Sequence, residues 1–145
     1  MGNRAVITKD RDLSGIGVYL HWNGGRDSVE AFLAYCDLKR YRGNGSSYWA
    51  AMLVNVCTNF FASGLSCGVV VAKNLDCDNY ENGVYFIDGE WRIVGRKFEH
   101  GEEYNYGLEE MIKKIDKRQP EAMRLTESDW ERFREVKNKV LKARV

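Results

Sequence analysis

The chain lacks the long apolar run, the metal-binding spacing and the excess charge that mark several common protein classes. No apolar segment approaches the ~20 residues that cross a bilayer, so we expect no membrane-spanning helix. The four cysteines form no C-x-x-C pair and histidine occurs only twice, which argues against a structural zinc site. A formal net charge of +1 gives no bulk attraction to DNA or to a membrane surface. We therefore expect no metal, no cofactor, and neither DNA nor a membrane as a partner.

The motifs of several large enzyme classes are also absent. The sequence has no G-x-S-x-G turn, no G-x-x-x-x-G-K-S/T loop and no H-E-x-x-H helix. Cys36 and Cys57 lie among apolar residues, where burial raises the pKa of a thiol and lowers its reactivity. A Cys–His pair formed by distant segments remains open, because neighbours in space need not be neighbours in sequence. The residues favour a binding protein over an enzyme.

Length and composition fit one globular domain. A chain of 145 residues can bury a sizeable core, and 44% hydrophobic with 30% charged residues is a globular composition. No signal sequence is visible ahead of Ala5, which predicts a cytosolic protein with reduced thiols.

The spacing of apolar residues predicts a sheet and several helices. Strands are predicted over 4–8, 16–22 and 68–72, with a hairpin of 84–87 and 91–94 around Asp88-Gly89. Helices are predicted over 27–41, 48–62, 107–118 and from 127 to the end. The expected fold is α+β in a single domain, with a small, mostly antiparallel sheet packed with about four helices. Residues 1–98 would supply the sheet and two helices, and 99–145 a C-terminal helical segment.

Two predicted helices carry strong apolar faces. The helix over 27–41 places an apolar stripe at helical spacing, which predicts its core face: Val29, Phe32, Leu33 and Cys36. The helix over 48–62 is apolar on nearly three sides, so it is either central in the core or part of a subunit interface. The core interpretation is favoured, because a domain of this size holds one central helix.

Residues 16–30 predict a strand, a two-glycine turn and the start of a helix. Gly24 and Gly25 allow backbone angles that other residues resist. Asp27 is predicted to cap the helix, with Glu30 in the reciprocal position of a capping box. A helix start carries unpaired N–H groups and the positive end of the helix dipole. This segment is therefore a candidate anion site.

Arginines and aromatic side chains supply the chemistry of that candidate site. Arg26 stands at the helix start, and Arg92 and Arg96 are predicted on one face of the hairpin's second arm, where paired guanidinium groups grip a diphosphate. An aromatic ring would stack a base. The predicted ligand-binding residues are His21, Trp22, Asn23, Gly24, Gly25, Arg26, Phe61, Tyr85, Arg92 and Arg96. The alternative for Arg26 is an ordinary strand–helix connection in which the arginine is merely exposed. The alternative for Arg92 and Arg96 is that they are solvated charges that protect an edge strand from aggregation.

An acidic loop over 73–82 begins like a calcium loop with Asp76 and Asp78. Tyr80 occupies the next ligand position, the central glycine is missing and no Glu closes the loop. A calcium site is therefore not expected there.

Three segments carry a resemblance to a known family. Residues 1–8, Gly17–Leu33 (Gly-Val-Tyr-Leu-His-Trp-Asn-Gly-Gly-Arg-Asp-Ser-Val-Glu-Ala-Phe-Leu) and 74–85 (Asn-Leu-Asp-Cys-Asp-Asn-x-x-Asn-Gly-Val-Tyr) resemble the phage-encoded Thoeris anti-defence sponges. The resemblance covers most of 1–98, and the two C-terminal helices carry no motif of the family. Carried over by position, it implies a binding role for Arg26 and for Arg92 or Arg96.

The resemblance implies a phage protein without enzymatic activity in the host bacterial cytoplasm. Such a protein sequesters the cyclic ADP-ribose isomers that bacterial TIR enzymes make, and cyclic oligonucleotides are a further candidate class of ligand. The sponges are symmetric homo-oligomers with ligand pockets between subunits.

Two other classes of function remain as alternatives. The chain is a protein–protein inhibitor or adaptor of phage origin if its apolar second helix and its last helix bind a host factor. It is a small enzyme that cleaves a cyclic nucleotide if His21 acts as a general base.

Overall fold

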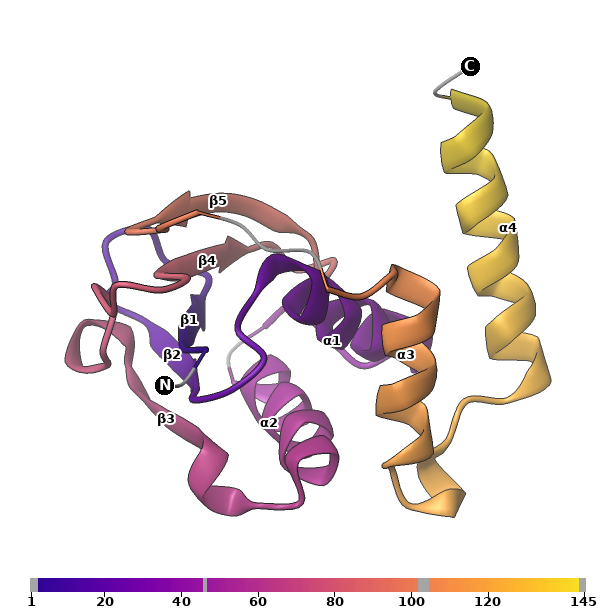
Figure 1. Ribbon diagram of the computed structural model, residues 1–145, viewed down its shortest axis with the longest axis horizontal. Coiled ribbons are helices and arrows are strands. Elements are labelled where there is room, and N and C mark those ends of the chain that lie inside the picture. Colours follow the sequence, from indigo (N-terminus) through magenta and orange to yellow (C-terminus); the bar gives the residue numbers. More distant parts are fainter. Residues whose placement is uncertain (1–2, 46, 102–104, 144–145) are drawn as a thin grey trace.

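A five-stranded sheet forms the centre of the molecule (Figure 1). The computed structural model describes residues 3–45, 47–101 and 105–143, with side chains as far as residue 137. The strands are β1 (Ala5–Thr8), β2 (Ile16–Leu20), β3 (Cys67–Val71), β4 (Val84–Ile87) and β5 (Ile93–Lys97), in the order β3-β2-β1-β4-β5. β1 pairs with β4 in parallel, and the other neighbours pair antiparallel. The prediction of a mostly antiparallel sheet in an α+β domain is confirmed.

Four α-helices accompany the sheet, as predicted. They are α1 (Arg26–Leu38), α2 (Tyr48–Phe61), α3 (Leu108–Lys117) and α4 (Glu127–Ala143), with short 3-10 turns at Gly64–Ser66, Ala72–Asn74 and Glu121–Met123. Figure 1 shows α1 and α2 beside the sheet, α3 next to α1, and α4 outermost. None of the helices in the described ranges combines the length and the apolar character that crossing a membrane requires.

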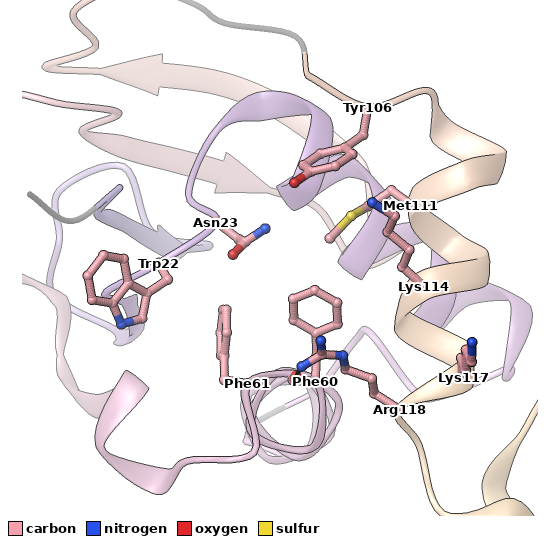
Figure 2. Close-up of a pocket in the computed structure, with 9 residues that line it drawn as sticks. All are labelled: Trp22, Asn23, Phe60, Phe61, Tyr106, Met111, Lys114, Lys117 and Arg118. Atoms are coloured by element: carbon pink, nitrogen blue, oxygen red, sulfur yellow. Dashed lines mark hydrogen bonds between the residues drawn. The ribbon is translucent and has the colours of Figure 1, made fainter.

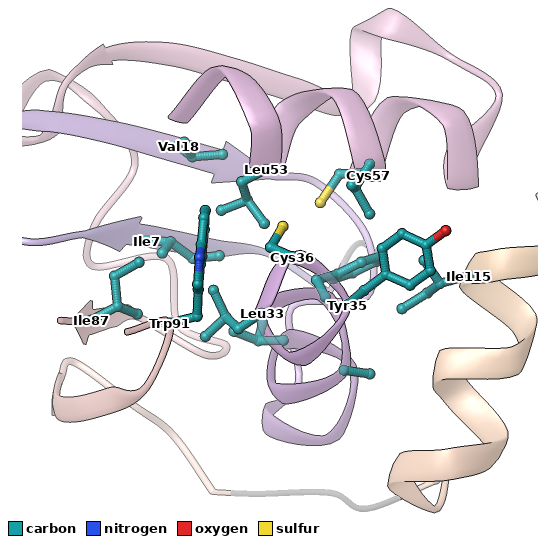
Figure 3. Packing of buried hydrophobic residues seen from close by; sticks show 14 of the residues in the cluster. Ile7, Val18, Leu33, Tyr35, Cys36, Leu53, Cys57, Ile87, Trp91 and Ile115 are labelled. Carbon is teal, nitrogen blue, oxygen red and sulfur yellow. The ribbon is translucent and has the colours of Figure 1, made fainter. Parts of the chain in front are cut away.

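The core lies between the sheet and the first two helices (Figure 3). The predicted apolar stripe of α1 is fully or almost fully buried: Val29, Phe32, Leu33 and Cys36. The central role predicted for α2 is confirmed for the face that carries Trp49, Leu53, Val56 and Cys57, all of which are buried. Burial of this apolar surface is the main force that holds both helices on the sheet.

The hairpin signal at Asp88-Gly89 marks a real turn, but the connection is longer than predicted. β5 begins at Ile93, which pairs with Ile87, so residues 88–92 form the connection. Trp91 leaves the ladder with a positive φ of 64° and is buried, and its indole N–H donates to the carbonyl of Tyr41 at 2.9 Å. Burying this large ring in the core takes precedence over extending the strand.

The turn before α1 requires glycine because of close packing, and not because of the unusual backbone angles that the sequence predicted. The left-handed residue is Asn23, with φ 54°, whereas Gly25 has an ordinary extended backbone. Gly24 is required by close approach, because a Cβ there would lie 2.6 Å from the carbonyl oxygen of Asn3. The Gly24 N–H donates to that same oxygen, and its own carbonyl accepts the Tyr85 hydroxyl at 2.7 Å.

We therefore predict that Gly24→Ala lowers the free energy of unfolding by about 1–3 kcal/mol, because the added methyl group forces the chain away from Asn3. Urea unfolding followed by circular dichroism measures the change. Gly64→Ala is the matched control, since a Cβ at Gly64 meets nothing within 4 Å. Equal unfolding midpoints for the two variants would contradict the packing described for Gly24.

Candidate functional site

A cavity of about 750 Å³ opens between the turn before α1, the end of α2, and α3 (Figure 2). Its volume lies within the range of about 300–1,000 Å³ that is usual for small-molecule sites. The turn contributes Trp22 and Asn23, and the last turn of α2 contributes Phe60 and Phe61. α3 and the residues on either side of it contribute the remainder: Tyr106, Met111, Lys114, Lys117 and Arg118.

Aromatic rings form most of the cavity wall. Figure 2 shows the rings of Trp22, Tyr106 and the two phenylalanines around a shared space, with Asn23 between them. Phe60 and Phe61 are held by the buried ring of Phe32, whose centre lies 5.5 and 5.9 Å from theirs. Such rings offer flat apolar faces on which a base can stack.

Trp22 is held at the mouth by its neighbour. The His21 ring meets Trp22 edge-on with 4.8 Å between ring centres, and His21 Nδ1 is 2.8 Å from the Tyr19 hydroxyl. Trp22 keeps 43% of its surface exposed, so its ring is open to a ligand.

The last turns of α3 present three cations to the cavity. Lys114 Nζ lies 4.4 Å from the centre of the Tyr106 ring, and the Arg118 guanidinium lies 5.2 Å from that of Phe60. Arg118 also donates to the Phe60 carbonyl at 3.0 Å, which ties the ends of α2 and α3 together. Lys117 makes no ion pair within the described part of the chain. Cations at a helix end also offset the helix dipole, so part of their role is structural.

Asp27 positions the aromatic residue that precedes α3. Its Oδ2 accepts the backbone N–H groups of Asn105 at 2.7 Å and Tyr106 at 2.9 Å, while Oδ1 accepts the Ser28 N–H. The carboxylate is almost fully buried. It sits in the first turn of α1, where the positive end of the helix dipole favours a negative charge.

The predicted capping box is therefore wrong. α1 begins at Arg26 with Gly25 as its N-cap, which has no side chain to contribute. Glu30 accepts a hydrogen bond from Arg26 Nε at 2.8 Å instead of returning to the backbone. The packing of the glycine turn fixes the start of α1, so Asp27 is not needed as a cap. Its carboxylate accepts hydrogen bonds from Asn105 and Tyr106 instead.

Some of the predicted ligand-binding residues meet at the cavity. Trp22, Asn23 and Phe61 line it, although sequence places Phe61 far from the other two. His21 stands behind Trp22, and Gly24 and Gly25 are buried beside it.

The structure does not bring the predicted arginines to this cavity. Arg26 pairs with Glu30 on its own helix. Arg92 lies in the hairpin connection, where it pairs with Asp88 and Glu90 at 2.9 and 3.1 Å, so it does not share a strand face with Arg96.

Arg96 is instead stacked 3.8 Å above the centre of the Tyr85 ring and donates to the Asn82 carbonyl. Tyr85 is fully buried, so its ring offers no face to a base. The prediction that Arg92 and Arg96 share one strand face is therefore wrong, and this arrangement does not support a joint grip on a diphosphate.

Sequence reasoning missed six of the lining residues: Phe60, Tyr106, Met111, Lys114, Lys117 and Arg118. One local signal was present, because Lys114, Lys117 and Arg118 share one side of a predicted helix at spacings of three and four. The sequence did not show which element that side faces, since the position of α3 depends on distant contacts.

The thiols are held away from the cavity lining. Burial raises the pKa of Cys36 and of Cys57, and a hydrogen bond with Cys57 lowers the pKa of Cys67. Within the described ranges no three His, Cys, Asp or Glu side chains gather in a way that could hold a metal ion. The lining itself combines stacking faces, cations and one amide, which is equipment for binding an anion with an aromatic part.

We predict that Asp27→Ala lowers the free energy of unfolding by about 1–3 kcal/mol and frees the Tyr106 amide, because the backbone N–H groups of Ser28, Asn105 and Tyr106 lose their acceptor. Hydrogen exchange at Asn105 and Tyr106, together with thermal unfolding, measures both effects. Asp12→Ala is the control, since Asp12 accepts two hydrogen bonds, both from Ser14, on an exposed loop. Unchanged exchange at Tyr106 would refute the positioning role.

Comparison with protein-family models, with curated protein sequences and with solved structures finds no match to this chain.

Proposed function

We propose that this protein captures a small nucleotide of the cyclic ADP-ribose class in the cavity and holds it chemically intact. The observation that carries the proposal is the convergence of four aromatic residues with Lys114, Lys117 and Arg118 around one space. A phosphate-bearing ligand with a base needs both kinds of group. Phosphates interact with cations, and a base stacks on a ring.

The resemblance of Gly17–Leu33 to the Thoeris anti-defence sponges supports the choice of ligand. Trp22 and Asn23 lie inside that segment and also line the cavity, so the resembling segment contributes directly to the site. The proposed biological role follows from that likeness. The protein would act in the host bacterial cytoplasm as a phage anti-defence protein and would sequester the signals that TIR enzymes make.

Capture without turnover requires affinity and enclosure. Each hydrogen bond to a charged group contributes about 1.5–3 kcal/mol, and nanomolar binding corresponds to about 12 kcal/mol in total. Several such contacts with the α3 cations, together with stacking on Trp22 or Phe61, reach that range after the cost of association. Cyclic oligonucleotides share the same chemistry and are the second ligand class to test.

The expectation of pockets between subunits stays a prediction. The cavity described here is formed by residues of a single chain. A second subunit is therefore not needed to form this cavity.

A role as an inhibitor or adaptor of a host protein is the second candidate. It is favoured by α4, the outermost helix, where Val136 keeps 60% of its surface exposed. The two candidates differ in what they bind, so ligand titration separates them.

We predict that Lys117→Ala and Trp22→Ala each weaken binding of cyclic ADP-ribose isomers by about tenfold to a hundredfold, because one removes a phosphate partner and the other a stacking face. Isothermal titration calorimetry measures the dissociation constants. Arg92→Ala is the control, since its side chain is 68% exposed in the hairpin connection and outside the cavity. If Arg92→Ala weakens binding and Lys117→Ala does not, the ligand binds elsewhere.

The captured ligand is expected to be recovered unchanged. The protein is incubated with each cyclic ADP-ribose isomer and each cyclic oligonucleotide, then boiled, and the released nucleotide is identified by chromatography and mass spectrometry. A ligand bound at a hundred times its dissociation constant stabilises the fold by about 2.7 kcal/mol, so a thermal shift must accompany binding. Recovery of a cleaved product would contradict capture and would indicate an enzyme. If no ligand produces a thermal shift, the proposed ligand binding is wrong and the protein-inhibitor candidate is favoured.

A further inference from the structure

Two cysteines meet where the end of α2 lies against the first residue of β3. Cys57 lies near the end of α2 with its side chain fully buried, and Cys67 begins β3. Cys67 pairs directly with Leu20 of β2, and residues directly opposite in an antiparallel pair project from the same face of the sheet. Leu20 is buried in the core that also contains Cys57, so Cys67 projects toward α2. A hydrogen bond joins the two thiols.

The two thiols differ in exposure and in protonation. Burial raises the pKa of Cys57, so this residue keeps its proton and donates it in the hydrogen bond. Accepting that bond lowers the pKa of Cys67, whose side chain is only partly buried. The thiolate is the form of cysteine that reacts with oxidants, and redox-sensitive cysteines are typically accessible, of low pKa and next to a second thiol. Cys67 therefore has the surroundings of an attacking thiol, and Cys57 those of the thiol that completes a disulfide.

The other two cysteines lack this combination. Cys36 is fully buried on α1, and burial raises the pKa of its thiol. Cys77 is partly exposed, but its thiol donates to the Ala72 carbonyl at 3.2 Å and burial raises its pKa. Among the four cysteines, all of which lie in the described ranges, Cys67 alone combines an accessible sulfur, a lowered pKa and a thiol partner.

We propose that Cys57 and Cys67 are a peroxide-sensitive pair that forms a reversible disulfide. The Cys67 thiolate attacks one oxygen of hydrogen peroxide and the O–O bond breaks. The Cys67 sulfur becomes a sulfenic acid, and the second oxygen leaves as hydroxide, which takes a proton from solvent to become water. The Cys57 sulfur then attacks the Cys67 sulfur, and the S–S bond forms as the sulfenic hydroxyl leaves with the Cys57 proton as a second water. Two electrons pass from the thiols to the peroxide, and two molecules of a small thiol such as glutathione reverse the bond by exchange.

This bond would close a loop that carries one wall of the cavity. Residues 58–66 lie between the two cysteines and include Phe60 and Phe61. The same loop contains Ala62, which ends α2 with a left-handed φ of 55°. A crosslink restricts the chain most in its unfolded and locally opened states, so the oxidised protein would resist opening of this wall. The proposal does not depend on what the cavity binds.

Peroxide treatment of the full chain, followed by mass spectrometry, tests the pair. A dilute sample is treated with hydrogen peroxide and denatured, and the remaining thiols are alkylated before digestion with trypsin. Cys57 and Cys67 fall in the same tryptic peptide, 43–73, whereas Cys36 falls in 27–39 and Cys77 in 74–92. Peptide 43–73 is expected without alkylation and lighter by two hydrogen atoms, and cleavage after Phe61 with chymotrypsin is expected to give two pieces that only dithiothreitol separates.

Three results of this experiment would overturn the proposal. Alkylation of both thiols after peroxide treatment would show that no bond forms. A link from Cys36 or Cys77 would join two different tryptic peptides and would place the reactive pair elsewhere. A link between two copies of peptide 43–73 would show reaction between chains.

Substitutions separate the roles of the two thiols. Cys57→Ser is expected to leave Cys67 as a sulfenic acid that dimedone traps. Cys67→Ser is expected to slow the oxidation of Cys57 at least tenfold, because a buried thiol of raised pKa reacts poorly by itself. Cys77→Ser is the matched control and is expected to form the bond at the unmodified rate. Equal oxidation of Cys57 with and without Cys67 would contradict the assignment of Cys67 as the attacking thiol.

Thermal unfolding measures what the bond does to the fold. Peroxide is expected to raise the unfolding midpoint of the unmodified chain and of Cys77→Ser by about 5 °C, because the crosslink restricts the unfolded chain, and dithiothreitol is expected to reverse the shift. The midpoint of Cys67→Ser is expected to stay unchanged under the same treatment. A chain with the bond formed but with an equal or lower midpoint would overturn the restraining effect on this loop.

Discussion

The packing of α3 against α1 is the contact on which the candidate site depends. Met111, Ile112 and Ile115 are completely buried in this seam. Polar groups then fix its position, because the Tyr35 hydroxyl donates to Asp116 at 2.8 Å and the buried Gln119 amide donates to the carbonyl of Val56 at 3.0 Å. Apolar burial supplies most of the stabilisation, and the buried hydrogen bonds select one orientation, since leaving their groups unpaired is costly. The α3 cations face the aromatic end of α2 because of this orientation.

The cavity combines a partly exposed lysine side chain with aromatic rings that are packed against the core. The rings of Phe60 and Phe61 are fixed by Phe32 in the core, whereas Lys114 is about half exposed on the surface of α3. Its ion pair with Glu110 spans 3.9 Å in an exposed setting, which contributes little to stability. A ligand phosphate therefore displaces little when it binds, and the pre-positioned rings limit the loss of side-chain freedom. These properties suit a protein that holds a ligand tightly without reacting with it.

The two sheet edges and the cavity lie on different parts of the fold. The sheet carries an open apolar edge at β3, while the helices α2 and α3 carry the cavity. β2 pairs with β3 and leads directly into the turn that carries Trp22, so the sheet supports one wall of the cavity.

The sequence by itself determined the elements and their faces. Local patterns predicted the buried face of α1, from the helical spacing of Val29, Phe32, Leu33 and Cys36, and the turn at Asp88-Gly89. Such patterns depend on neighbouring residues and can be interpreted without knowing how the rest of the chain folds. The capping role given to Asp27, the strand position given to Trp91 and the paired role of Arg92 and Arg96 failed where a distant contact outweighed a local preference.

Only the tertiary structure decided where the cavity lies and which charges face it. Trp22 and Lys117 are far apart in sequence, and they line one space because burial of the α3 apolar face sets the helix beside α1 and the end of α2. That burial depends on the whole core and not on any short segment, so residue patterns alone identified aromatic groups without locating the cations that complete the site.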